Sequence, residues 1–168
     1  MTELAPVPTL ISRMADDLRE LLAIRAIRDP AMIGIHSGGA WVARELHGQI
    51  GLAAPLGTLD IAFYRDDVGT RGVHPQVRPS NLPFAVDDRN IILVDDVLYS
   101  GRTVRAALNE IFDFGRPRRV LLAVLVDRGE RELPVAADVV GTRITLADGQ
   151  RVKLQGPEPM ELTIQDKA

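Results

Sequence analysis

The sequence predicts a doubly wound α/β domain, in which helices cover both faces of an open parallel sheet. Segments 31–35, 90–94 and 120–126 are almost entirely apolar, as strands buried on both faces are. Stretches with helical spacing of apolar side chains separate them, and glycine-containing turns follow several of the strands. A chain of 168 residues with 46% hydrophobic residues is long enough for one such domain. We therefore expect residues 1–168 to form a single domain.

The first part of the chain is predicted as helix, strand, helix, strand. Residues 9–28 place apolar side chains on one helix face, and Pro30 ends that helix. Residues 31–35 then form a buried strand that runs into the glycine loop His36-Ser37-Gly38-Gly39. The next predicted elements are a helix at 41–50 and a strand at 56–63.

A long segment without periodicity separates the two parts of the chain. Residues 66–89 collect glycine and proline, and a stretch of that length inside a small domain is typical of a functional loop such as a lid. A strand at 90–94, a helix starting near Thr103 and a strand at 120–126 follow. Gly115 and Pro117 are suited to ending the helix.

The last part of the chain predicts shorter strands. Residues 138–154 have this character, and Asp148-Gly149 is a favourable hairpin turn. We expect residues 127–154 to form a small hood, or cap, at the edge of the sheet.

Composition excludes several classes of protein. The chain has no cysteine, so disulfides, zinc–thiolate sites and thiol nucleophiles are excluded. A net charge of −3 argues against indiscriminate nucleic-acid binding, which depends on an excess of Lys and Arg. No apolar run is long enough to span a membrane, and the N-terminal residues lack the features of a signal peptide. We expect a cytoplasmic protein.

Two adjacent carboxylates, Asp95 and Asp96, mark the expected ligand site. Ligands of open α/β sheets bind at the carboxyl ends of the strands, where these residues lie. The small and polar residues 97–103 lead into a helix, whose N-terminus and backbone N–H groups can hold a phosphate. Carboxylates accept hydrogen bonds from a vicinal diol, so the pair and the loop together suit a ribose 5-phosphate. The alternative is an ordinary strand–turn–helix junction whose aspartates cap the helix.

Residues 91–103 resemble the thirteen-residue signature for 5-phosphoribosyl-1-pyrophosphate (PRPP) of type I phosphoribosyltransferases. Further segments resemble the PyrR family, whose members are bifunctional pyrimidine operon regulators and uracil phosphoribosyltransferases. The resemblance covers about residues 33–144. Its segments are Tyr64-Arg65-Asp66-Asp67, Thr103-Val104-Arg105-Ala106, Phe114-Gly115-Arg116-Pro117 and 125–134.

The resemblance implies a type I phosphoribosyltransferase fold and a role for each matching residue. Asp95 and Asp96 would be the catalytic pair that binds the ribose hydroxyls, and Arg71 and Arg78 would belong to the lid. Mg²⁺ would be bound mainly through PRPP, with no protein ligand named. Val126, Asp127 and Arg128 would bind the base, largely through backbone groups. The remaining PRPP-binding residues would be Ser37, Gly38, Gly39, Arg65, Val97, Leu98, Tyr99, Ser100, Gly101, Arg102 and Thr103.

Two departures from the family pattern affect these expectations. Gly38 stands at or near the place where the family commonly has an arginine for pyrophosphate, which puts the catalytic rate in doubt. Purine enzymes usually carry an acid where this chain has Tyr99, so a pyrimidine base is favoured.

The function that follows is conversion of uracil and PRPP to UMP and pyrophosphate, with regulation of pyrimidine genes as a second role. Two alternatives stay open: a nucleotide-sensing regulator with weak or no catalysis, and a transferase for another base. The family also implies a dimer or larger homo-oligomer, and RNA as a partner. Glu130, Ala136 and Thr142 replace side chains that tend to be basic in RNA-binding members, while Arg25, Arg28 and Arg131 remain. These replacements argue against RNA binding by this chain.

Overall fold

The computed structural model describes residues 3–61 and 80–168, and in that part a five-stranded sheet forms the centre of the molecule. The strand order is β2-β1-β3-β4-β5, and every neighbouring pair is parallel. The predicted parallel α/β architecture is confirmed. The strands are β1 (Ala31–Ile35), β2 (Gly57–Leu59), β3 (Asn90–Leu98), β4 (Arg119–Asp127) and β5 (Val139–Arg143).

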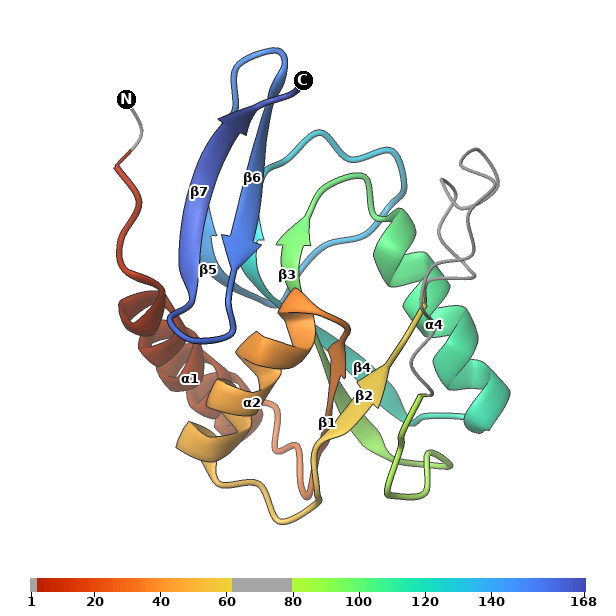
Figure 1. The fold of residues 1–168 in the computed structure, drawn as a ribbon. Coiled ribbons are helices and arrows are strands. Elements are labelled where there is room, and N and C mark those ends of the chain that lie inside the picture. Colours follow the sequence, from red (N-terminus) through yellow and green to blue (C-terminus); the bar gives the residue numbers. More distant parts are fainter. Residues whose placement is uncertain (1–2, 62–79) are drawn as a thin grey trace.

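Helices cover the sheet on both faces (Figure 1). On one face, α1 (Val7–Ile24) and α2 (Gly38–Ile50) pack on a core that includes Ile92 and Val94 of β3. On the other face, α4 (Arg102–Phe114) packs on a core that includes Ile91 and Leu93. Successive side chains of β3 therefore enter different cores, which explains why the strand is apolar throughout.

A two-stranded antiparallel hairpin, β6 (Gln150–Gln155) and β7 (Glu161–Asp166), completes the described fold. It packs Val152 and Leu154 into the core beneath α1 and α2. Residues 148–149 do form a turn, but the predicted hairpin there is wrong. β5 pairs in parallel with β4, and the antiparallel partner of β6 is β7, beyond residues 156–160. The reason is that β6 buries only alternate side chains, so it forms a one-sided ribbon and does not extend the main sheet.

Several element boundaries differ from the predicted ones. α1 ends at Ile24 and not at residue 28, because Ala26 adopts a positive φ of 50°, which a right-handed helix does not accommodate. β3 continues to Leu98, so Asp95 and Asp96 lie within the strand instead of after it. Arg65, Arg71 and Arg78 lie outside the described residues, as does most of the predicted lid. No helix among the described residues is long and apolar enough to cross a membrane.

Candidate functional site

Three connections meet at the carboxyl edge of the parallel sheet. β1 leads through His36 and Ser37 into α2, β3 leads through residues 99–101 into α4, and β4 leads into the hood from Arg128 onward. Because β1 and β4 are the two neighbours of β3, their connections flank the acidic pair on β3. The predicted glycine loop, acidic pair and base segment therefore share one edge of the sheet.

The acidic pair lies against the first turn of α2. Asp95 is only 5% exposed and is the only charged residue that is buried in the described part of the chain. A methyl group at Gly39 would come 3.2 Å from Asp95 Oδ1, and one at Gly38 would overlap the Asp96 carboxylate. The structure thus brings Gly38 and Gly39 into contact with both aspartates, as a shared ligand site requires.

Backbone hydrogen bonds orient the two carboxylates. The Asp96 N–H donates to Asp95 Oδ1 at 2.9 Å, and the Val97 N–H donates to Asp96 Oδ1 at 2.8 Å. Each carboxylate thus accepts a hydrogen bond from the N–H of the following residue, and a carboxylate can accept several such bonds. Such a pair can accept hydrogen bonds from the hydroxyls of a sugar.

The loop between β3 and α4 has the shape of an anion site. Gly101 adopts a φ of 96°, a conformation that glycine reaches without strain, and α4 begins at the next residue. The N-cap residue Gly101 has no side chain with which to cap this helix, so the first-turn N–H groups that follow Arg102 can bind an anion. Ser100 Oγ accepts the Arg102 N–H at 3.2 Å. Of the predicted loop residues, Leu98 is instead buried in the core under α4, where it can contribute only backbone groups.

The hood is joined to this loop by backbone hydrogen bonds. The N–H groups of Glu132 and Leu133 both donate to Ser100 O at 2.9 Å, and the Arg128 N–H donates to Leu98 O at 3.1 Å. Val135 and Leu133 also pack within 3.4 Å of where a Gly101 side chain would begin. The phosphate loop and the hood therefore form one connected wall.

An ion pair inside the hood fixes the end of β4. Arg131 Nη2 donates to both carboxylate oxygens of Asp127, at 2.7 and 2.8 Å, and the Gly129 N–H donates to Asp127 Oδ1 at 2.9 Å. Burial acts to raise the pKa of Asp127. The hydrogen bonds from Arg131 and Gly129, with the charges of Arg131 and Arg143, outweigh burial and lower the pKa below its ordinary value of 3.8. Asp127 is therefore a carboxylate at neutral pH.

Tyr99 and Arg128 stack across the gap between loop and hood. The Arg128 guanidinium carbon lies 3.9 Å from the Tyr99 ring centroid, within the range of a cation–π interaction. Arg128 also pairs with Glu130 at 3.0 Å, and only 8% of its side chain is exposed. Val126 points into the core below α1 and is fully buried. Of the predicted base-binding residues, Asp127 and Arg128 therefore have their side chains in the hood, whereas Val126 can contribute only backbone groups.

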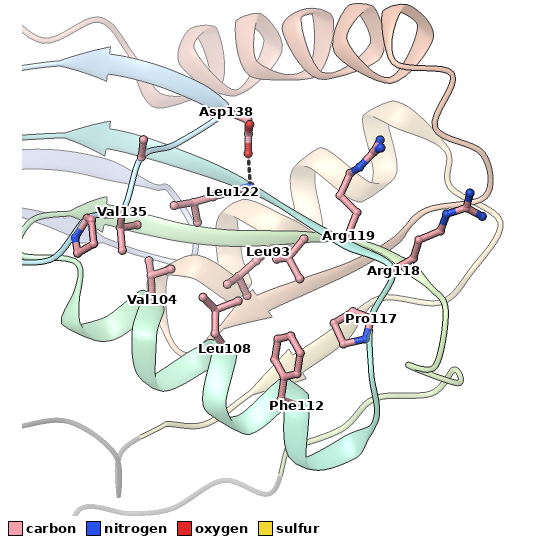
Figure 2. A pocket seen from close by; sticks show the side chains of 13 residues that line it. Leu93, Val104, Leu108, Phe112, Pro117, Arg118, Arg119, Leu122, Val135 and Asp138 are labelled. Carbon is pink, nitrogen blue, oxygen red and sulfur yellow. Dashed lines mark hydrogen bonds between the residues drawn. The ribbon is translucent and has the colours of Figure 1, made fainter.

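A hollow of about 480 Å³ lies elsewhere, between α4 and β4 (Figure 2). Its walls are mostly apolar and include Val104, Leu108 and Phe112 of α4. Neither aspartate of the acidic pair lines it. The hollow is thus separate from the candidate site.

Comparison with known proteins identifies the family to which this chain belongs. The family described as phosphoribosyl transferase domain matches residues 9–155. A curated relative from Pseudomonas fluorescens, named bifunctional protein PyrR, is 55% identical over 159 residues, which are 95% of each chain. The protein of the same name from Nitrosococcus oceani is 56% identical over 95% of this chain and 91% of its own length. The chain belongs to the PyrR family of phosphoribosyltransferases.

Solved structures agree with this PyrR-family assignment at the level of the fold. A hypoxanthine-guanine phosphoribosyltransferase from Bacillus anthracis superposes with a TM-score of 0.66, covering 86% of this chain and 84% of its own. A hypoxanthine phosphoribosyltransferase from Trypanosoma cruzi also gives 0.66. Identities of 19% and 18% mean that these likenesses concern the fold alone.

One central residue of the site was not singled out by sequence reasoning. The sequence places Arg131 in the segment 125–134 and among the arginines of a potential RNA-binding surface, but it does not indicate that the side chain binds Asp127. The four-residue spacing of Asp127 and Arg131 was a usable signal, although that spacing brings side chains together reliably only in a helix. Here a turn that contains Gly129, with a φ of 74°, brings them together instead.

Proposed function

We propose that this PyrR-family protein is a uracil phosphoribosyltransferase, forming UMP and pyrophosphate from uracil and PRPP, with a second role in regulating pyrimidine genes. The observation that carries the catalytic role is the acidic pair held between a glycine turn and an open helix N-terminus. The bifunctional name shared by relatives of 55% and 56% identity supports two roles.

Each part of the site receives one part of PRPP in this proposal. Asp95 and Asp96 accept hydrogen bonds from the ribose 2′- and 3′-hydroxyls, while the residues from Val97 to Thr103 bind the 5-phosphate. Ser37, Gly38 and Gly39 face the pyrophosphate. Uracil lies under the hood at Val126–Arg128. Arg65 contributes to PRPP binding, and Arg71 and Arg78 approach the pyrophosphate from the predicted lid.

The chemistry then needs positioning and electrostatic stabilisation, with no covalent enzyme intermediate. The C1–oxygen bond to pyrophosphate breaks and the bond from C1 to uracil N1 forms, and the proton from N1 passes to the leaving pyrophosphate. Positive charge develops on the ribose ring in between. The carboxyl groups of Asp95 and Asp96 lie beside the ring in this proposal, and the hood and lid keep water from the sugar.

Mg²⁺ fits this site as a companion of the substrate. Magnesium prefers oxygen ligands and is commonly held by one or two carboxylates together with substrate phosphates. Asp95 and Asp96 provide carboxylate oxygens next to the place of the ribose and the pyrophosphate. We propose that the ion is bound mainly through PRPP, where it would neutralise the leaving pyrophosphate.

The decisive experiment measures UMP formation from uracil, PRPP and Mg²⁺. The wild-type protein should turn over, and an Asp95→Asn/Asp96→Asn variant should lose most of that activity, while an Asp16→Asn/Asp17→Asn variant on the exposed face of α1 should keep it. A wild type that binds PRPP or UMP without turnover would instead support a nucleotide-sensing regulator. Faster turnover of guanine or hypoxanthine than of uracil would reject the pyrimidine assignment.

The regulatory role supplies the second half of the proposal. RNA is the partner that the family suggests, and Glu130, Ala136 and Thr142 leave the expected surface less basic. We therefore propose that any RNA binding is weak at physiological salt, because few phosphates would be neutralised. A filter-binding titration against a pyrimidine operon leader RNA, repeated at several salt concentrations, tests this point, and light scattering tests the proposed homo-oligomer.

A further inference from the structure

The guanidinium of Arg131 bonds to the loop that follows β3, to the end of β4 and to the far side of the hood. Its Nη1 donates to Tyr99 O at 2.7 Å, its Nη2 to both oxygens of Asp127, and its Nε to Val135 O at 3.0 Å. A longer contact of 3.4 Å joins Nη1 to Gly129 O. We infer that Arg131 is the positioning residue that fixes the base-binding hood relative to the phosphate loop, an inference that rests on the proposed transferase function.

The geometry explains why arginine is needed at this position. A guanidinium holds its donors in a rigid planar fork, so it can bind a carboxylate with two bonds and backbone oxygens with its other donors. A lysine could pair with Asp127 but could not also reach Tyr99 O and Val135 O in fixed directions. The pair is also largely shielded, with side chains of Arg131 and Asp127 only 22% and 13% exposed, so water competes weakly for these bonds.

The same contacts define what Arg131 and Asp127 do not do. Both oxygens of Asp127 accept hydrogen bonds from Arg131, so its carboxylate supports the hood. Every guanidinium nitrogen of Arg131 donates within the protein, so its charge serves the hood and not a nucleic-acid phosphate. Arg131 therefore acts on the transferred base through the hood backbone, as a positioning residue.

Loss of Arg131 should lower kcat/KM for uracil much more than it weakens the binding of PRPP. The phosphate loop keeps its strand, its helix and the bonds from Glu132 and Leu133 to Ser100 O, whereas the 127–131 turn loses its main side-chain anchor. Small displacements of a bound group cost about 10- to 100-fold in rate. We expect Arg131→Met to lower kcat/KM for uracil by about 10- to 100-fold, with the Kd for PRPP changed by less than about threefold.

The experiment compares Arg131→Met and Arg131→Lys with Arg151→Met. Arg151 is an exposed arginine of β6 whose Nη2 donates to Gln165 Oε1 at 3.2 Å, so its variant controls for loss of a surface charge. Arg131→Lys should recover only part of the activity. Thermal melts establish that each variant is folded. The inference would be overturned if Arg131→Met lost affinity for PRPP by the same factor as kcat/KM for uracil. It would also be overturned if the variant kept the wild-type kcat/KM for uracil.

A separate measurement distinguishes this inference from the proposed function. If the wild type does not use uracil, the proposed function fails, and calorimetry then compares UMP with ribose 5-phosphate. Weaker binding of UMP to Arg131→Met, with unchanged binding of ribose 5-phosphate, would still support the positioning role. Equal affinities of wild type and variant for UMP would reject it.

Discussion

At the scale of single residues, Gly38 lets the backbone of α2 lie against the Asp96 carboxylate of β3. The sequence shows a glycine near the place where the family commonly has an arginine. The structure gives a physical reason for a small residue, because a Cβ at this position would overlap the Asp96 carboxylate. The absence of a side chain lets the first turn of α2 lie directly beside the carboxylate.

Replacement of Gly38 tests this contact. Gly38→Ala should displace the Asp96 carboxylate and weaken PRPP binding by about 10-fold or more, the effect of losing one or two hydrogen bonds to a charged group. Gly48→Ala is the matched control, because Gly48 lies in the same helix and a methyl group there meets nothing within 4 Å. Calorimetric titration with PRPP measures both. If Gly38→Ala binds PRPP with unchanged affinity, the Asp96 carboxylate can move without weakening PRPP binding.

At the scale of elements, the hood depends on a charged pair whose state varies with pH. The pKa of Asp127 is lower in the folded protein than in the unfolded chain. Ionised Asp127 therefore stabilises the folded state at pH values above its ordinary pKa of 3.8, and this contribution is lost as the pH falls through the folded-state pKa. Between pH 5 and 8 the pair stays ionised.

The prediction from this pKa concerns Asp127→Asn. The variant should melt at a lower temperature than the wild type at pH 7, and the difference should shrink as the pH falls below about 4. Melting curves from pH 3 to pH 8 measure this difference. A difference that is constant over the whole range would show that ionised Asp127 does not contribute.

Element types were largely predictable from the sequence, and their ends were not. The apolar runs of β1, β3 and β4 identified the parallel sheet, because strands buried on both faces leave little room for polar residues. β3 was predicted too short, since its acids read as the start of a loop, whereas neighbouring strands hold them in the sheet. β7 was missed because Glu161–Asp166 buries few side chains and depends on β6 for its pairing.

At the scale of the whole molecule, two cores share one sheet, and the hairpin belongs to one of them. Leu154 is 5% exposed and packs in the core under α1 and α2. Residues far apart in the sequence therefore stabilise the helix that faces the acidic pair. The sequence could indicate a candidate site at 95–103 because the acids Asp95 and Asp96 and the loop that follows them are adjacent in the chain. It could not predict the Arg131 network, which joins segments that only the fold brings together.

A core substitution in the hairpin tests this arrangement. Leu154→Ala should lower the free energy of unfolding by about 2–5 kcal/mol, the usual cost of emptying a buried leucine site. Ile24→Ala, at a side chain that is 74% exposed, should change it by less than about 0.5 kcal/mol. Urea unfolding at neutral pH measures both variants. A hairpin that unfolds on its own would instead give Leu154→Ala a separate early transition.

The position of the acidic pair on β3 has a consequence for amide hydrogen exchange. β3 is paired on both sides and covered on both faces, so its amides should exchange slowly even in the free protein. The loop at 99–101 and the hood are joined to it through a small number of hydrogen bonds. Binding of PRPP and UMP should therefore slow exchange at residues 99–101 and 128–134 far more than in β3. The substrate would then add protection to the loop and the hood, while β3 is already protected by its pairing.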